Sequence, residues 1–248
     1  GLPMPYECRN GGCGVCKATV VGGAVAMSAY QPSALSAAER AGGRILLCCA
    51  TVEGDVELEY EAGAALRGTA SHAYTSTIER LERIGRDVML VALRLAPGER
   101  IGFQAGQYIN IILEDGDRRS YSFTAPSGET DRIELHVRRA PGGKFTTALF
   151  ERMSVGDTLR FEGPHGQFTL HEPSAKPLIF VAGATGFAPV KSLLEEAFKR
   201  EIERPLYLYW GVRKRADLYM AELPERWMRE HQNFKFVPVL SEPDPEDR

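Results

Sequence analysis

Cysteine is missing from most of this 248-residue chain. All five cysteines lie among the first 49 residues, at positions 8, 13, 16, 48 and 49, and positions 50–248 contain none. Cysteines that only filled hydrophobic cores would be scattered along the chain, so their clustering indicates one shared task. Disulfide bonds suit small secreted domains, and no stretch here resembles a secretory signal. We therefore favour a metal centre and expect a cytoplasmic protein.

Long apolar runs and an excess of positive charge are also missing. No hydrophobic stretch approaches the roughly 20 residues of a membrane-spanning helix, so we expect no membrane role. The formal net charge of −3 gives no electrostatic support for nucleic-acid binding. Residues 1–66 hold four Lys or Arg and seven Asp or Glu, whereas residues 67–248 hold 26 of each kind. The imbalance falls on the cysteine-bearing part, where an acidic face would either steer a basic partner or only aid solubility.

The first cysteines have a spacing that is typical of an iron–sulfur site. Residues 8–16 read CRNGGCGVC, so Cys8, Cys13 and Cys16 follow the C-x4-C-x2-C pattern of plant-type [2Fe–2S] ligands, with a distant fourth cysteine at Cys48 or Cys49. Zinc prefers two C-x2-C pairs, and only one is present. The interleaved glycines let backbone N–H groups approach electron-rich sulfurs. We predict a [2Fe–2S] cluster; a zinc-holding module is the alternative.

After the cysteine-bearing part, the expected secondary structure of the chain changes twice. Residues 61–71 are small and polar and read as a linker. Alternating strand patterns at barrel-like spacing follow at 74–81, 88–95, 107–113, 119–123 and 132–138, with a helix expected over 144–153. From residue 177 the pattern becomes strand, glycine turn, helix, strand, helix, strand, which is typical of an α/β domain.

A short motif on one expected strand resembles a flavin site. Residues 118–122 read RRSYS, which contains the Arg-x-Tyr-Ser flavin signature of the ferredoxin–NADP reductase superfamily. On a strand, Arg119 and Tyr121 share a face, so the guanidinium could hold a phosphate while the aromatic ring lies on the flavin. The resemblance implies that Ser120 also binds the cofactor and that Ser122 lies near flavin N5. Tyr121 and Ser122 are therefore the candidate catalytic residues.

A second segment, HVRRAPGGKFTT at residues 136–147, resembles the second flavin segment of that superfamily. In the family, glycines there lead into a helix whose N-terminus receives the pyrophosphate. This implies FAD rather than FMN. The implied cofactor-binding residues are His136, Val137, Arg138, Gly142, Gly143, Lys144, Phe145 and Thr146. A third segment, EGPHGQF at 162–168, resembles the turn that closes the family's barrel.

A glycine turn predicts the nucleotide site. Residues 178–189 read LIFVAGATGFAP, a buried strand followed by the superfamily's G-x-T-G-x-x-P variant of a dinucleotide turn. Small residues there let a pyrophosphate approach the positive end of a helix. Gly211 and Arg213 follow the next strand, and ligands bind beyond the carboxyl ends of strands in such sheets. The candidate residues of the turn are Gly183, Ala184, Thr185, Gly186 and Pro189.

These motifs, in this order, resemble the iron–sulfur flavoprotein reductases, which include reductase components of aromatic-ring and phenol oxygenases and of the CDP-6-deoxy-glucoseen pathway. The resemblance implies a multi-domain α+β and α/β chain. Residues 1–62 would form a partial β-grasp ferredoxin domain, 68–172 an antiparallel β-barrel that binds FAD, and 173–248 a partial parallel NAD-binding domain. The family's Leu-x-Cys-[Gln/Cys] pattern implies Cys48 as the fourth cluster ligand.

The implied activity is transfer of electrons from NADH, rather than NADPH, through FAD and the cluster to an oxygenase or dehydratase component. Two alternatives are a zinc-holding interaction module and a truncated flavin-binding fragment without turnover. Both ends look cut, because the family's first ferredoxin hairpin and last NAD-domain strands have no counterpart. We therefore expect slow reaction with NADH and an uncovered apolar edge at residues 234–240.

Overall fold

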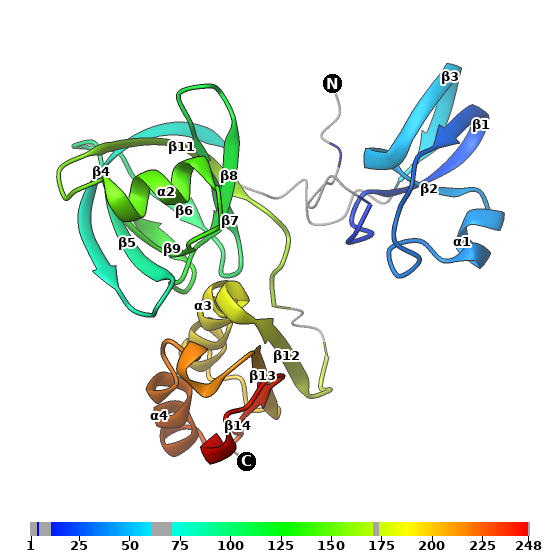
Figure 1. Cartoon of the computed structure of the whole chain (residues 1–248). Helices are drawn as coiled ribbons and strands as arrows, with labels where there is room; N and C mark the ends of the chain where they lie inside the picture. The colour runs from blue at the N-terminus through cyan, green and yellow to red at the C-terminus, as the bar shows by residue number, and fades with distance from the viewer. Residues whose placement is uncertain (1–3, 5–10, 61–70, 171–173, 248) are drawn as a thin grey trace. The chain divides into compact units, whose positions relative to one another are not determined.

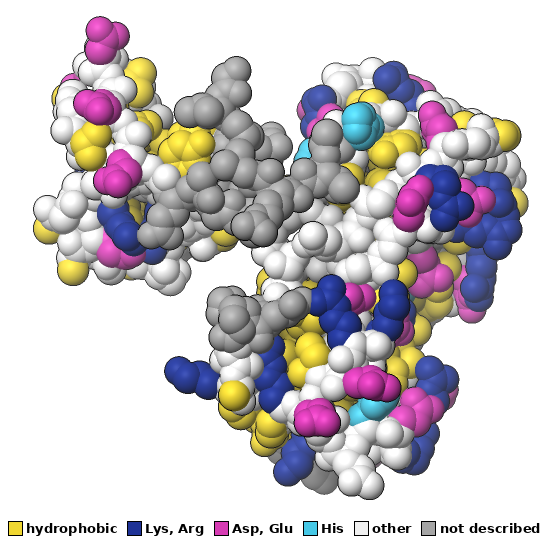
Figure 2. Space-filling model, turned by 180° about the vertical axis from the view of Figure 1, so that it is seen from behind, with side chains coloured by type: hydrophobic (Ala, Val, Ile, Leu, Met, Phe, Trp, Pro, Cys, Tyr) yellow, Lys and Arg dark blue, Asp and Glu magenta, His cyan; other side chains and the backbone are white. Residues whose placement is uncertain are grey.

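A computed structural model describes residues 4, 11–60, 71–170 and 174–247 (Figure 1). The chain divides into two compact units, residues 1–68 and 69–248. Within the described residues, no helix has the length and apolar character needed to cross a bilayer. Lys and Arg are interspersed with Asp and Glu over the visible surface of the second unit, as expected from their equal numbers after residue 66 (Figure 2).

The first unit is a small antiparallel sheet with one short helix. Strand order is β2-β1-β3, and a buried cluster that includes Leu35, Leu46 and Cys49 forms its core. Ser36 and Glu39 cap the helix with a reciprocal capping box, which satisfies two backbone N–H groups at its start. The elements are β1 (Lys17–Met27), α1 (Ala37–Ala41), β2 (Arg44–Leu46), the 3-10 turn η1 (Leu47–Cys49) and β3 (Ala50–Glu59).

The second unit begins with an antiparallel barrel. Its main sheet has the order β10-β5-β4-β11-β7-β8, and a bridge between Phe123 and Leu135 joins the two ends. Residues 162–165, expected in a turn, belong to β11, which pairs with both β4 and β7. The elements are β4 (His72–Arg83), β5 (Val88–Leu95), β6 (Ile101–Phe103), β7 (Tyr108–Ile112), β8 (Arg118–Ser122), β9 (Gly128–Thr130), β10 (Arg132–Arg138), α2 (Lys144–Glu151) and β11 (Thr158–His165).

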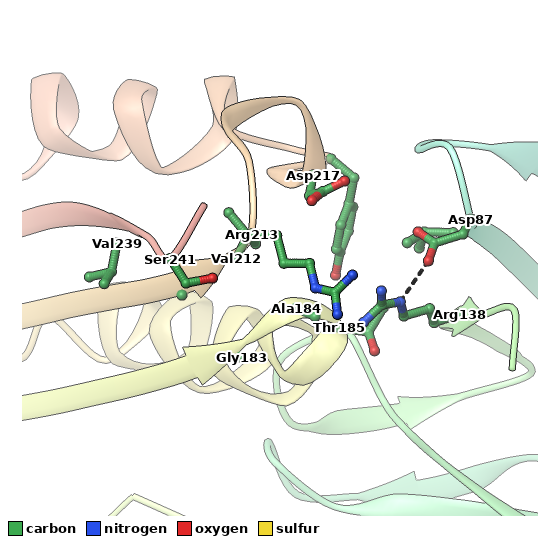
Figure 3. A pocket seen from close by; sticks show the side chains of 13 residues that line it. Asp87, Arg138, Gly183, Ala184, Thr185, Val212, Arg213, Asp217, Val239 and Ser241 are labelled. Atoms are coloured by element: carbon green, nitrogen blue, oxygen red, sulfur yellow. Dashed lines mark hydrogen bonds and ion pairs between the residues drawn. The ribbon is translucent and has the colours of Figure 1, made fainter. Parts of the chain in front are cut away.

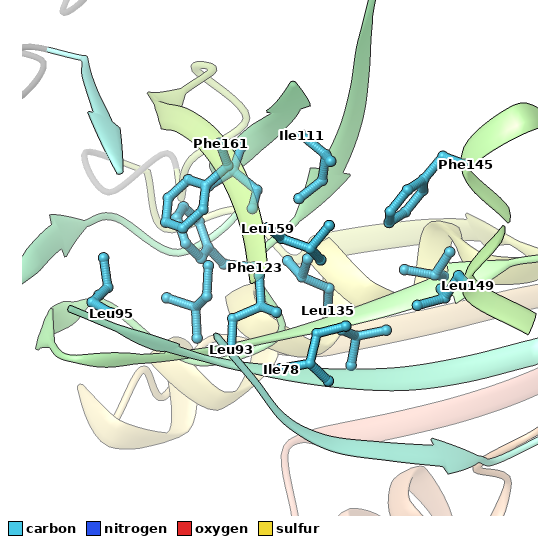
Figure 4. Close-up of a cluster of buried hydrophobic side chains, with 14 of the residues drawn as sticks. Ile78, Leu93, Leu95, Ile111, Phe123, Leu135, Phe145, Leu149, Leu159 and Phe161 are labelled. Carbon is cyan, nitrogen blue, oxygen red and sulfur yellow. The ribbon is translucent and has the colours of Figure 1, made fainter. Parts of the chain in front are cut away.

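Alternating side chains of these strands fill the barrel interior (Figure 4). Ile78, Ile111 and Phe161 are fully buried, and α2 adds Phe145 and Leu149 to the same cluster. Each buried side chain of this size contributes roughly 1.5–3 kcal/mol through removal of apolar surface from water. This core positions β8 and the start of α2, the two flavin segments predicted from the sequence.

A parallel α/β sheet completes the second unit. Its strand order is β12-β13-β14, and Phe187 of α3 stacks on Trp210 of β13 with ring centroids 3.9 Å apart. On the other face of the sheet Ile179, Val181 and Val239 are exposed, and β14 is an edge strand among the described residues. The elements are β12 (Leu178–Gly183), η3 (Ala184–Gly186), α3 (Phe187–Lys199), β13 (Leu206–Val212), η4 (Arg215–Asp217), α4 (Glu222–Glu230), β14 (Phe234–Leu240) and η5 (Pro245–Asp247).

Polar contacts join α3 to the barrel loops. The Gly106 N–H donates to Ser192 Oγ at 3.2 Å, the Ser127 N–H donates to Glu196 Oε2 at 2.9 Å, and Lys191 Nζ donates to the Thr124 carbonyl at 3.1 Å. Gly106 has φ +86°, and a Cβ there would lie 1.8 Å from the carbonyl oxygen of Phe168. Only glycine therefore permits this close passage between the barrel and the following segment.

Candidate functional site

Two of the predicted cluster ligands lie together. Cys16 is buried at the start of the sheet, Cys48 is half-buried in η1, and their sulfur atoms are 3.4 Å apart. The backbone N–H of Gly11 donates to Cys48 Sγ at 3.3 Å, the kind of contact that stabilises an electron-rich ligand sulfur. Cys13 is exposed, and Cys8 lies outside the described residues.

Burial disfavours the charged form of the Cys16 thiol. Burial, with additional effects of Cys48 and Cys13, raises the pKa of the Cys16 thiol to about 11. A coordinated iron ion would instead hold it as the thiolate, which is the ligand form. No three His, Cys, Asp or Glu side chains converge on one metal position within residues 4 and 11–60 or the described part of the second unit. The described pair, with its backbone donor, fits two ligands of a four-cysteine cluster.

Cys49 has a different environment from Cys48. It is buried, and its thiol donates to the Ala29 carbonyl at 3.7 Å. Gly11 packs directly over it, because a Cβ on Gly11 would lie 2.7 Å from Cys49 Sγ, and Gly11 has φ +71°. This arrangement supports Cys48 as the ligand and Cys49 as packing beneath the cysteine loop.

Strand β8 presents the predicted flavin residues on its two faces. Tyr121 packs on Phe145 of α2 with ring centroids 5.4 Å apart, and burial raises the pKa of its hydroxyl to about 12. The half-exposed Arg119 donates to Asp117 Oδ2 at 3.1 Å. Ser120 faces the other way and donates to Asn110 Oδ1 at 2.7 Å. Ser122 ends the strand, paired in register with Tyr108 and half-buried.

The start of α2 can receive an anion. Gly142 has φ +69°, Gly143 is the N-cap residue, and no side chain caps the first turn, so its N–H groups remain available. Lys144 pairs with Asp115, which raises the pKa of the lysine, and the charge of Arg119 acts on it in the opposite direction. The structure thus brings two cations and an uncapped helix start together. This helix start and the two cations suit a phosphate of FAD, which would have to displace Asp115 and Asp117 from their present pairs with Lys144 and Arg119.

Residues 136–138, His-Val-Arg, are more deeply buried at their first two positions than the rest of the predicted flavin site. The His136 side chain is fully buried, its Nδ1 lies 3.1 Å from the Tyr219 hydroxyl, and its Nε2 has no hydrogen-bond partner among the described residues. Val137 is buried in the barrel core. Burial, with a smaller effect of Lys191, lowers the pKa of His136 to about 3. The imidazole is therefore neutral, and the 3.8 Å approach of Glu134 to Nε2 is not an ion pair.

A pocket of about 340 Å³ opens at the carboxyl ends of the parallel strands (Figure 3). It contains five of the predicted nucleotide residues, Gly183, Ala184, Thr185, Gly211 and Arg213. Gly186 and Pro189 lie in η3 and α3 and do not line it. The barrel contributes Asp87, Val88 and Arg138, and Arg138 Nε donates to Asp87 Oδ2 at 2.7 Å.

The sequence did not reveal several residues of this pocket. Ligands bind at the carboxyl ends of parallel strands. If this rule had been applied to every strand of the sheet, it would have predicted Val212, Val239 and Ser241 as pocket residues. Asp87, Val88, Asp217 and Tyr219 carry no local signal, because they reach the pocket only through the packing of barrel and sheet.

Family comparisons agree with this geometry. Residues 1–53 match a 2Fe-2S iron-sulfur cluster binding domain, residues 75–170 an oxidoreductase FAD-binding domain, and residues 180–248 an oxidoreductase NAD-binding domain. The chain belongs to the iron–sulfur flavoprotein reductases. The three matches follow the order predicted from the sequence, and the cluster-domain match favours iron–sulfur over zinc at the cysteines.

Relatives of this reductase cover nearly the whole chain. It is 37% identical to terephthalate 1,2-dioxygenase reductase component 2 of a Comamonas species, over 98% of this chain and 71% of that protein. It is 36% identical to the CDP-6-deoxy-L-threo-D-glycero-4-hexulose-3-dehydrase reductase of Yersinia pestis, over 98% of this chain and 72% of that protein. The crystal structure of Amycolatopsis cytochrome P450 reductase GcoB matches with a TM-score of 0.77 and 38% identity, over 100% of this chain and 76% of that one.

The reductase is thus an NAD(P)H-dependent flavin and iron–sulfur oxidoreductase. Bound cofactors supply the redox chemistry, in which two electrons enter as hydride and leave one at a time. The candidate regions for holding these cofactors are β8 and α2 for the flavin, the pocket beyond β12 and β13 for the nucleotide, and the cysteine loop for the cluster.

Proposed function

We propose that this reductase oxidises NADH and passes the electrons through FAD and the [2Fe–2S] cluster to a separate oxygenase or dehydratase component. The observation that carries the proposal is the shared pocket, in which the nucleotide turn at Gly183–Thr185 faces Arg138 of the flavin-binding barrel. The named relatives are reductase components of a dioxygenase and of a sugar dehydrase, which supports a partner of that kind. Action in the cytoplasm stays a prediction.

We assign the three cofactors to three domains, residues 1–62, 68–172 and 173–248, of which the second and third lie in one compact unit. In this assignment four cysteines hold the cluster, Arg119 and the start of α2 hold the FAD phosphates, and Tyr121 and Ser122 contact the flavin ring. The proposed cluster ligands are Cys8, Cys13, Cys16 and Cys48.

Carboxylates around the pocket favour NADH over NADPH. Asp217 lines the pocket, Arg213 Nε lies 3.7 Å from Glu242 Oε1, and Lys214 Nζ lies 2.6 Å from Asp244 Oδ1. Arg213 and Lys214, like Arg138 with Asp87, are therefore already paired with carboxylates, and the 2′-phosphate of NADPH would meet the negative charge of Asp217.

The preference can be tested with Asp217→Asn and Glu242→Gln. Each change removes one negative charge, so we expect kcat/KM for NADPH to rise about 3- to 10-fold while the value for NADH changes little, in line with the cost of a like-charge contact. Steady-state kinetics with both nucleotides are the measurement. An unmodified protein that already prefers NADPH would contradict the assignment.

The activity itself is tested by visible absorption, flavin extraction and NADH oxidation on the purified chain. We expect bands of both flavin and iron–sulfur cluster, FAD in the extract, and NADH-dependent reduction of an artificial one-electron acceptor. A colourless protein, or one that binds FAD without reacting with NADH, would support the zinc-holding module or the flavin-binding fragment instead.

A further inference from the structure

Tyr219 lies between the flavin-binding barrel and the nucleotide domain. It follows η4 in the nucleotide domain, where its ring meets Trp210 edge-on with centroids 5.2 Å apart and Phe187 with centroids 6.1 Å apart. On its other side the ring meets His136 of β10 edge-on, with centroids 5.4 Å apart. The tyrosine thus packs simultaneously on the cores of both domains.

Two close contacts tie Tyr219 to the barrel. Its hydroxyl lies 3.1 Å from His136 Nδ1, within hydrogen-bond distance. The turn between β4 and β5 passes so near that a Cβ on Gly85 would lie 2.9 Å from Cβ of Tyr219. Burial raises the pKa of the Tyr219 hydroxyl and lowers that of His136 to about 3, so both groups are neutral at ordinary pH. The hydrogen bond therefore joins two uncharged groups at neutral pH.

The same tyrosine is connected to the nucleotide turn. Tyr219 lines the pocket beyond the parallel strands. Its neighbour Trp210 donates from Nε1 to the carbonyl oxygen of Ala184 at 2.9 Å, and Ala184 has φ +46°, an unusual conformation for a residue with a side chain. Contacts therefore run without a break from His136 on the barrel, through Tyr219 and Trp210, to the turn at Ala184.

We propose that Tyr219 is a positioning residue that sets the nucleotide turn at the correct distance from the flavin-binding strand. The inference rests on the proposed function, because hydride transfer needs its two reacting atoms held about 3–3.5 Å apart. The contacts of Lys191, Ser192 and Glu196 hold α3 against the barrel loops. The Tyr219 contact is different, since it lies at the pocket itself and reaches the proposed nucleotide turn through Trp210.

Tyr219→Phe is the first test, because it removes the hydroxyl and keeps the ring packing. We expect the rate constant of flavin reduction by NADH in stopped-flow to fall about tenfold, since small misplacements cost large factors in rate. Affinity for ADP-ribose, which lacks nicotinamide, should stay within about twofold, because no group that holds the pyrophosphate is altered. Tyr209→Phe is the matched control: Tyr209 is half-exposed in β13, outside the pocket, and its variant should behave like the unmodified protein.

The partner residue gives a second test. His136→Phe breaks the same hydrogen bond from the barrel side, so it should slow flavin reduction, and the double variant should be no slower than the slower single variant. Thermal unfolding should be measured on the unmodified protein, the two single variants and the double variant. The losses of stability should be non-additive in the same way, and this measurement needs no hydride transfer. Unchanged reduction in Tyr219→Phe, a parallel loss of ADP-ribose affinity, or additive effects would overturn the proposal. If the unmodified protein were not reduced by NADH, the proposed function would fail, while the unfolding cycle would still decide whether Tyr219 couples the two domains.

Discussion

At the scale of single residues, the predicted cluster ligands Cys16 and Cys48 have different surroundings from the neighbouring Cys49. Cys16 and Cys48 bring their sulfurs together, whereas Cys49 donates to a carbonyl and lies beneath Gly11. The sulfurs of these adjacent cysteines lie 3.7 Å apart, yet Cys48 accepts from Gly11 N–H whereas Cys49 donates to the Ala29 carbonyl, so their surroundings differ.

Cys16→Ser should remove the cluster and leave the flavin in place. Serine is a hard, weakly acidic ligand where iron prefers thiolate, and the barrel has its own core in the other compact unit. The measurement is visible absorption for the cluster together with FAD content after extraction. Cys49→Ser is the matched control and should keep its cluster. If Cys49→Ser lost the cluster while Cys48→Ser kept it, the choice of fourth ligand would be reversed. Joint loss of FAD and cluster in Cys16→Ser would argue against independent units.

At the scale of elements, the loop before β7 depends on one glycine. Gly106 and Gly116 both have strongly positive φ, but a Cβ on Gly106 would meet the Phe168 carbonyl whereas a Cβ on Gly116 would meet open space. The backbone strain is common to both sites, so comparison of the two isolates the steric clash.

Gly106→Ala should therefore destabilise the second unit much more than Gly116→Ala. We expect about 1 kcal/mol for Gly116→Ala from left-handed strain alone, and at least about 2 kcal/mol more for Gly106→Ala, because a main-chain carbonyl must move. Denaturant unfolding followed by flavin fluorescence is the measurement. Equal losses would show that the Phe168 segment gives way at little cost.

At the scale of the whole second unit, the buried contact between barrel and nucleotide domain is sensitive to acid. The pKa of His136 is about 3 in the folded protein and 6.5 for an ordinary histidine. Between those values the unfolded chain takes up a proton that the folded chain does not, so stability falls as pH falls through this window.

His136→Phe should flatten that dependence. Each pH unit below 6.5 costs the unmodified protein up to about 1.4 kcal/mol of unfolding free energy through this residue, and the variant lacks the titrating group. Denaturant midpoints from pH 7.5 down to pH 5 are the measurement, with the slope rather than the absolute stability as the readout. A variant with the same slope as the unmodified protein would assign the acid sensitivity to other groups.

Much of the fold was predictable because its signals are local. Strand alternation at residues 88–95 and 132–138 agrees with β5 and β10, and the helix expected over 144–153 is α2 at Lys144–Glu151. The cysteine spacing, the RRSYS strand and the glycine turn each occupy a dozen residues or fewer, so the sequence alone revealed them. Strands β6 and β9 were missed because three residues are too few to show alternation, and β11 because its glycine and proline read as a turn.

Sequence by itself determined the order of the three domains and the cofactor class that each one binds, because short motifs carry that chemistry. Tertiary structure alone decided that the Cys48 sulfur lies 3.4 Å from that of Cys16, that the His136 side chain meets Tyr219, and that Asp87 and Asp217 share one pocket. The physical reason is distance along the chain. His136 and Tyr219 are 83 residues apart and meet only where the barrel packs on the nucleotide domain, whereas Asp87 and Arg138, 51 residues apart, meet because β10 pairs with β5 within the barrel.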